Sequence, residues 1–255
     1  QLNDLASSIR DLMAPDGIFI FEVQYLVDII DGMVLGAVIH EHLSHHSVKP
    51  MQQFLDRNGM ELINVERNHF QGGSFIGVAQ LKGGPRKVDE SVAEQVDYEV
   101  KRGLDRPELI KDFSNRLQSL RIEMADLIKK WKESGATIAG YGAARSGPTL
   151  TAQFKLGKDI SFIVDDHPQK VNKYTPGDKN KVLPTKELYS RMPEYTIILA
   201  WVHAKKIIID NLEYLNKGGN FVLCCPEIKV IDAQNWEEAL KKMSAKEESL
   251  CLTKN

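Results

Sequence analysis

The chain has 255 residues, more than one domain usually holds, and 42% of them are apolar or aromatic, which is enough for ordinary buried cores. Its 33 Lys and Arg residues nearly balance 35 Asp and Glu residues, so the formal charge of −2 excludes the basic footprint of a nucleic-acid or anionic-membrane binder. The apolar runs are much shorter than the ~20 residues that cross a bilayer, and the N-terminus lacks a secretory signal pattern. We expect a cytoplasmic protein with small-molecule partners, and the sequence leaves the oligomeric state open.

The N-terminal residues begin with a helix-turn-strand pattern. Residues 2–13 favour a helix, and Pro15-Asp16-Gly17 predicts a turn into the apolar strand Ile18–Val23. Residues 24–47 have mixed apolar and His-rich sequence without a clean period, which indicates a functional loop or short helices.

Two strands and a boundary follow. A helix near residues 49–58 ends at Asn-Gly, and strand patterns at Glu61–Arg67 and Ser74–Leu81 predict an antiparallel hairpin. Gly and Pro at 82–85 continue neither a strand nor a helix, so this stretch is the strongest boundary signal. The first domain is therefore predicted over residues 1–85.

Residues 88–134 are predicted to be helical, with one break at Gly103–Pro107 because proline cannot sit inside a helix. Apolar residues recur there at spacings of three and four, giving one stripe: Leu117, Leu120, Met124 and Leu127. We predict that residues 86–135 form a helical linker.

The rest of the chain repeats a strand, turn, helix order. Strands are predicted at Thr137–Tyr141, Ser161–Val164, Thr196–Ala200 and Asn220–Cys224, with helices near 146–156 and 203–216 and a charged helical tail from about 232. Strands separated by crossover helices pair in parallel, and their apolar character predicts burial on both faces. The fold class is therefore α/β, with a Rossmann-like parallel sheet over residues 136–255.

The segment 38–46 holds four of the seven histidines. Imidazole takes up a proton near neutral pH, and a neighbouring carboxylate such as Glu41 can fix its tautomer, so a general base is chemically reasonable. A polar loop, or a histidine satisfied by backbone groups, is the alternative. The zinc-protease pattern fails because position 44 is Ser, and His42 and His45 lack a third ligand, so we predict no metal site.

The second candidate segment, Gly140–Gly147, lies after a strand and before a helix. Glycines there let backbone approach a ligand, and the helix N-terminus attracts an anion. Asp165-Asp166 ends the next strand, near the spacing of a ribose-binding carboxylate. Arg145 replaces the third glycine of the dinucleotide fingerprint, which disfavours NAD but adds a guanidinium suited to phosphate. A plain tight turn remains the alternative.

Several motifs together resemble one family. The stretch Leu12–Glu22 resembles the turn and fifth strand of class I methyltransferases. Further motifs resemble the S-adenosylmethionine-dependent sugar C-methyltransferases in their order: His40–Ser44, Gln71–Ser74, Gly140–Ala144, Asp165–Pro168 and Tyr174–Gly177. The resemblance covers most of residues 5–230. It implies that residues 1–85 are the C-terminal portion of a class I methyltransferase catalytic domain, and that 136–255 are the C-methyltransferase C-terminal Rossmann-like domain.

The resemblance also implies an activity and site residues. The family transfers a methyl group to a carbon beside the keto group of a nucleotide-linked deoxysugar, through an enolate. By motif match His42 is the expected base, Glu41 orients it, and His40 assists. Substrate binding is expected at the glycine segment and at one further histidine: Gly140, Tyr141, Gly142, Arg145 and His45. The family has tyrosines where this sequence has Ile39 and His45, and His45 is expected to substitute as a hydrogen-bonding group.

In the family a zinc-binding domain and the glycine-rich S-adenosylmethionine loop come first, and neither pattern is found here. We therefore expect an incomplete enzyme that binds S-adenosylmethionine poorly alone, with cofactor-binding residues unknown. The alternative is a catalytically inactive, truncated paralogue that binds a nucleotide sugar or serves as an interaction domain.

Overall fold

The computed structural model describes residues 2–251, with side chains for residues 2–245, and the chain divides into two compact units. Of the described residues, the first contains 2–31, Ser44–Phe113 and 247–251, and the second contains Gly32–Leu43 and Ser114–Lys246. The segment with His40, Glu41 and His42 therefore belongs to the second unit. The predicted linker over residues 86–135 stays a prediction.

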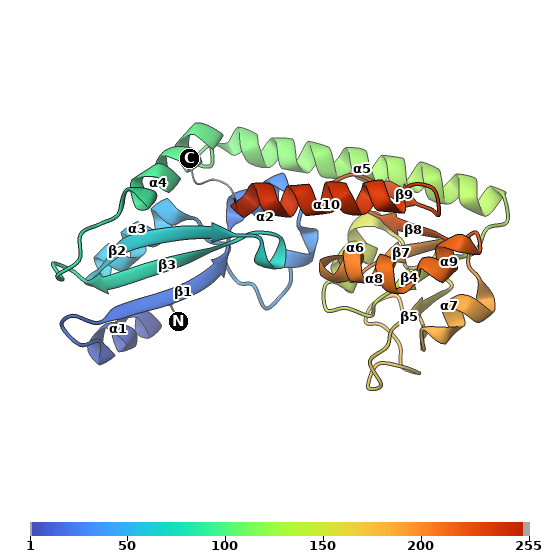
Figure 1. The fold of residues 1–255 in the computed structure, drawn as a ribbon, viewed down its shortest axis with the longest axis horizontal. Helices are drawn as coiled ribbons and strands as arrows, with labels where there is room; N and C mark the ends of the chain where they lie inside the picture. The colour runs from blue at the N-terminus through green and yellow to red at the C-terminus, as the bar shows by residue number, and fades with distance from the viewer. Residues whose placement is uncertain (1, 252–255) are drawn as a thin grey trace. The chain divides into compact units, whose positions relative to one another are not determined.

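The first unit has a three-stranded sheet in the order β1-β3-β2, in which both pairings are antiparallel. Its elements are α1 (Leu2–Leu12), β1 (Ile18–Gln24), α2 (Leu26–Asp31), α3 (Val48–Arg57), β2 (Met60–Asn68), η2 (Phe70–Gly72), β3 (Ser74–Leu81) and α4 (Glu90–Arg102) (Figure 1). The predicted β2–β3 hairpin is confirmed, and the predicted strand at 18–23 joins the free side of β3.

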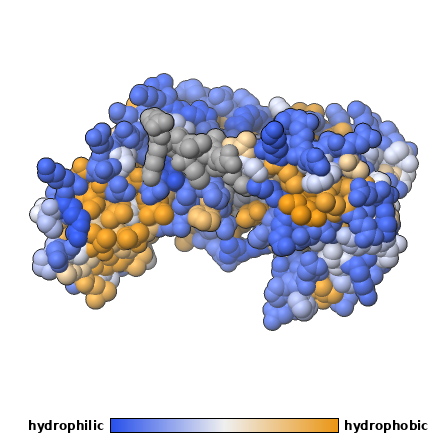
Figure 2. All heavy atoms as spheres, in the orientation of Figure 1, coloured by the Kyte–Doolittle hydropathy of each residue, from blue (hydrophilic) through white to orange (hydrophobic). Residues whose placement is uncertain are grey.

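One side of the first unit's sheet forms the core, with Tyr25, Leu55 and Phe75 almost fully buried. Strand β1 alternates between exposed and half-buried residues, and Ile18 and Ile20 are 44% and 59% exposed. Figure 2 shows apolar side chains gathered over this sheet.

The long helix α5 (Pro107–Glu133) follows the predicted break, where Gly103 adopts a left-handed conformation and ends α4. The predicted apolar stripe is confirmed at Leu120 and Met124, which are buried. Farther along the helix, buried Trp131 stacks on Tyr195 with ring centroids 3.9 Å apart.

The second unit has a six-stranded sheet in the order β6-β5-β4-β7-β8-β9. Its strands are β4 (Ile138–Tyr141), β5 (Phe162–Val164), β6 (Val182–Leu183), β7 (Tyr195–Ile198), β8 (Asn220–Leu223) and β9 (Lys229–Ile231). All neighbours pair in parallel except β9, which runs antiparallel to β8. The predicted parallel α/β architecture is confirmed for the four predicted strands, while β6 and β9 are too short to give a periodic sequence signal.

Helices connect and cover these strands: η1 (Leu35–Ala37), α6 (Gly147–Phe154), α7 (Lys186–Arg191), η3 (Trp201–His203), α8 (Ala204–Asp210), α9 (Leu212–Asn216) and α10 (Trp236–Cys251). The predicted single helix at 203–216 is divided at Asn211, whose side chain donates to the carbonyl of Ile207 at 2.7 Å. Within residues 2–251, no helix is long and apolar enough to span a membrane.

The strand order fixes where a ligand can bind. The chain moves from β4 outward through β5 to β6, then returns to place β7 on the other side of β4. Such a reversal leaves a hollow beyond the carboxyl ends of the two central strands, because their connections diverge to opposite sides. The Gly142–Ser146 loop leaves β4 at this edge.

Candidate functional site

A cavity of about 800 Å³ lies at this strand edge, and we call it the strand-end cavity. Its lining comes from residues within three stretches, 38–40, 142–151 and 169–176, and from Ile163 in β5, Val182 in β6 and Leu199 directly after β7. All of them belong to the second unit. The described lining residues include Arg145, Lys170 and Lys173 but no Asp or Glu, so the cavity suits an anion.

The start of the loop requires glycine. Gly142 has φ of +90°, and a Cβ atom there would lie 2.4 Å from the Cβ of Ala200. Its N–H donates to the carbonyl of Val164 at 2.7 Å, which joins the loop to the end of β5. Gly140 lies inside β4 and does not line the cavity. A Cβ there would lie 3.0 Å from Ile163 and Leu199, so this glycine permits close strand packing.

Asp165 organises the loop from behind the cavity. Its two carboxylate oxygens accept hydrogen bonds from the backbone N–H groups of Ala143, at 2.7 Å, and His167, at 2.8 Å. The ammonium of Lys170 lies 3.3 Å from the same carboxylate. Asp165 is buried, whereas Asp166 is exposed. Of the acidic pair seen in the sequence, Asp165 therefore holds the loop in place, whereas Asp166 faces solvent.

The N-terminus of α6 offers fewer backbone donors than the sequence indicates. The N–H of Gly147 donates to Ala144 at 2.9 Å, and Pro148 has no N–H. An anion in the cavity would therefore depend more on side chains, and Arg145 is the cation that this loop itself carries into the lining.

The segment 32–43, which carries His40 and His42, contacts other residues of the second unit at three points. Gly36 in η1 lies against the indole of Trp201, where a Cβ would be 2.0 Å from Nε1. Thr149 donates from its hydroxyl to the carbonyl of Val38 at 3.0 Å. Arg145 and Glu41 form an ion pair with 2.5 Å between Nη1 and Oε2. These contacts hold Val38, Ile39 and His40 in the cavity wall.

His42 is half-buried and is not among the residues that line the cavity. Its Nδ1 atom is 2.8 Å from the carbonyl oxygen of Ala37. A carbonyl only accepts hydrogen bonds, so Nδ1 must carry the proton and Nε2 keeps the lone pair in the neutral ring. This tautomer suits a base, whereas His40 is the histidine that lines the cavity.

Besides Gly140, two further predicted substrate-binding residues, Tyr141 and His45, do not line the cavity. Tyr141 is buried among the side chains packed on the sheet, and its hydroxyl donates to Asp166 at 3.4 Å. Burial raises the pKa of Tyr141, which keeps the hydroxyl protonated. His45 belongs to the first unit, where burial together with the charge of His45 lowers the pKa of His46. Of the predicted substrate-binding set, Gly142 and Arg145 line the cavity.

Sequence reasoning missed the basic and aromatic residues after β5. Lys170, Lys173, Tyr174 and Thr175 all line the cavity. The connection that leaves a parallel strand at its carboxyl end passes the ligand edge of the sheet, so its cations were a usable signal. Among residues 2–245, no group of three or more His, Cys, Asp and Glu side chains is placed to hold a metal ion.

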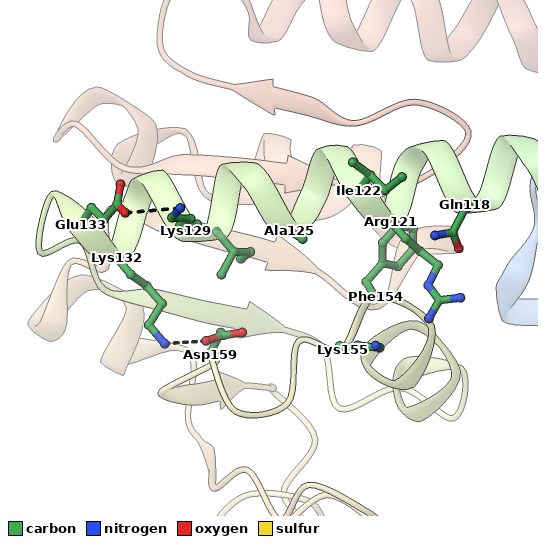
Figure 3. Close-up of a pocket in the computed structure, with 11 residues that line it drawn as sticks. Gln118, Arg121, Ile122, Ala125, Lys129, Lys132, Glu133, Phe154, Lys155 and Asp159 are labelled. Atoms are coloured by element: carbon green, nitrogen blue, oxygen red, sulfur yellow. Dashed lines mark hydrogen bonds and ion pairs between the residues drawn. The ribbon is translucent and has the colours of Figure 1, made fainter.

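A second hollow of about 670 Å³, which we call the α5 groove, lies along α5 and the end of α6 (Figure 3). Isoleucine, alanine and phenylalanine side chains form part of it, and its charged residues are Arg121, Lys129, Lys132, Glu133, Lys155 and Asp159. Lys132 binds Asp159 at 2.6 Å, which joins the helix to the opposite wall (Figure 3). In contrast to the strand-end cavity, this groove has carboxylates in its own lining.

Comparison with known proteins identifies the family. Residues 69–226 match the family model described as the C-methyltransferase C-terminal domain. The C-methyltransferase NovU of Streptomyces niveus is 29% identical over 236 residues, which cover 92% of this chain and 56% of that protein. The chain thus spans a little over half the length of this relative. Because the family model matches more than half of the chain, the protein belongs to the C-methyltransferase C-terminal domain family.

Proposed function

We propose that this chain is the C-terminal portion of an S-adenosylmethionine-dependent C-methyltransferase that acts on a nucleotide-linked keto-deoxysugar through an enolate. The observation that carries the proposal is the strand-end cavity, which has cations in its lining and a wall formed in part by Val38, Ile39 and His40, two residues before His42. Family membership supports the reaction class. The chemistry of the cavity supports the kind of substrate.

A nucleoside diphosphate suits this cavity in size and charge. Small-molecule sites commonly enclose 300–1,000 Å³, and this cavity measures about 800 Å³. Arg145 offers a planar set of N–H donors for phosphate oxygens, and Lys170 and Lys173 add two ammonium groups. Glu41 and Asp165 pair with Arg145 and Lys170 from outside the lining, which holds both cations in position before a ligand arrives.

In the proposed reaction His42 removes the proton from the carbon beside the ketone. The C–H bond breaks, the proton moves to Nε2, and the electron pair passes to the carbonyl oxygen. The bond from Nδ1 to Ala37 favours this tautomer and stabilises the imidazolium that forms. Glu41 pairs with Arg145, and His40 in the cavity wall is proposed to donate to the developing negative oxygen.

The strand-end cavity does not suit S-adenosylmethionine itself. The donor carries a sulfonium, an ammonium and one carboxylate and so has a net positive charge, whereas the described lining contains three basic side chains and no carboxylate. We therefore assign the cavity to the acceptor substrate and give the donor no place among the described residues. A test of the base must accordingly work without the donor.

Solvent exchange provides such a test. A ketosugar that loses its α-proton to the protein and regains one from D2O gains deuterium, which proton NMR detects. With UDP-4-keto-6-deoxyglucose as the probe, we expect the chain to accelerate this exchange, and His42→Ala to slow it by roughly 10²-fold, as expected for loss of a general base. His40→Ala should slow it less, because that histidine only stabilises the oxygen.

The outcomes separate the alternatives. Near-normal exchange in His42→Ala would remove His42 from the role of base. If the unmodified chain binds UDP but does not exchange the proton, an inactive paralogue that retains nucleotide-sugar binding becomes the better description.

A further inference from the structure

Tyr174 is a large aromatic side chain on the rim of the strand-end cavity, and it is 63% exposed. Single exposed aromatic residues are common on protein surfaces, so the exposure of Tyr174 alone does not indicate a binding site. Here the ring lies next to Lys173 in sequence, and both residues line the same cavity as Arg145. An aromatic face therefore shares one cavity with the proposed phosphate-binding cations.

Backbone hydrogen bonds anchor the segment that carries this ring. Tyr174 forms an antiparallel bridge with Lys181, and the N–H of Thr175 donates to the carbonyl of Asn180 at 2.9 Å. Asn180 is buried, and its side-chain amide donates to the carbonyls of Gly157 and Ile160, both at 2.9 Å.

The preceding residue is anchored as well, because the N–H of Val182 in β6 donates to the carbonyl of Lys173 at 2.8 Å. The stretch from Lys173 to Val182 is thus tied to the edge of the sheet at both ends. A ring on an anchored loop loses little conformational entropy when a ligand stacks on it.

From these observations we infer that Tyr174 forms a nucleobase subsite, in which the base of the substrate stacks on the phenol ring while Lys173 and Arg145 bind the diphosphate. The inference rests on the proposed function and adds the group that distinguishes a nucleotide from a simple phosphate ester. Stacking depends on the flat face of the ring, so the hydroxyl of Tyr174 is dispensable.

Calorimetric titration of the full chain with UDP and with inorganic pyrophosphate tests the subsite. We expect Tyr174→Ala to weaken UDP binding about tenfold and to leave pyrophosphate binding unchanged, because pyrophosphate has no base. Tyr174→Phe retains the ring and should bind UDP within about twofold of the unmodified chain. Lys173→Ala should weaken both ligands, because it removes a phosphate contact.

Three results would overturn the subsite. UDP affinity unchanged in Tyr174→Ala would show that no base stacks there. Equal weakening of UDP and pyrophosphate would make Tyr174 a support for the loop alone. If neither probe binds the unmodified chain, the diphosphate cavity of the proposed function fails, and the subsite fails with it.

Discussion

The two hollows of the second unit are similar in size, about 800 Å³ for the strand-end cavity and 670 Å³ for the α5 groove, and both contain several cations. They differ in where their carboxylates lie. In the α5 groove Glu133 and Asp159 are part of the lining, and Asp159 binds Lys132 from the opposite wall (Figure 3). In the strand-end cavity the carboxylates that pair with the cations, Glu41 with Arg145 and Asp165 with Lys170, are not part of the lining.

This difference teaches that volume and a count of cations do not identify an anion site. A site needs cations and backbone held in place beforehand, since an interaction that must first be assembled loses part of its free energy to ordering. Asp165 supplies that order by fixing the Ala143 and His167 amides. In the α5 groove the acids instead pair with cations from within the lining, Asp159 with Lys132 and Glu133 with Lys129. Two substitutions test the comparison, from the larger expected effect to the smaller.

Removing Asp165 should have the largest effect. In Asp165→Ala the amides of Ala143 and His167 lose their acceptor, and Lys170 loses its ion pair. We expect a loss of about 2–3 kcal/mol in the free energy of unfolding, measured by urea denaturation. The matched control is Asp166→Ala, because Asp166 is exposed and should change stability by less than about 0.5 kcal/mol. Equal effects of the two substitutions would contradict the assigned role of Asp165.

A smaller effect should distinguish the two hollows directly. Arg145→Ala removes one charge-assisted contact to phosphate, so UDP binding should weaken about tenfold in calorimetric titration. Arg121→Ala removes an arginine from the α5 groove and should leave UDP affinity within about twofold. The comparison breaks if Arg121→Ala weakens UDP binding as much as Arg145→Ala does.

Much of the fold could be predicted from the sequence because its signals are local. Gly103 and Pro107 mark the gap between α4 and α5, and the apolar runs in β4 and β7 predict buried parallel strands. The helix break at Asn211 depends on a side chain that bonds its own backbone four residues earlier, which no periodic pattern reveals. The assignment of residues 32–43 to the second unit depends on contacts such as Gly36 against Trp201, which are distant in sequence.

The candidate site could be predicted only in part, for a similar reason. The glycine segment identified the loop, and Gly142 and Arg145 do line the cavity. Tyr141 is the last residue of β4 and its side chain packs in the core, whereas Gly142 begins the loop and lines the cavity with its backbone. Lys170 and Lys173 follow a strand that was predicted to be parallel, so their place after its carboxyl end was a usable signal, and the strand order shows that this connection borders the cavity.

Amide chemical-shift mapping with UDP tests the central claim most directly, because it reports which hollow the nucleotide enters. The account predicts that the largest shifts fall on the loop Gly142–Gly147 and on residues 169–175, with the amides of 118–133 in α5 nearly unchanged. Shifts concentrated along α5 and at Lys155, with the glycine loop unaffected, would contradict it.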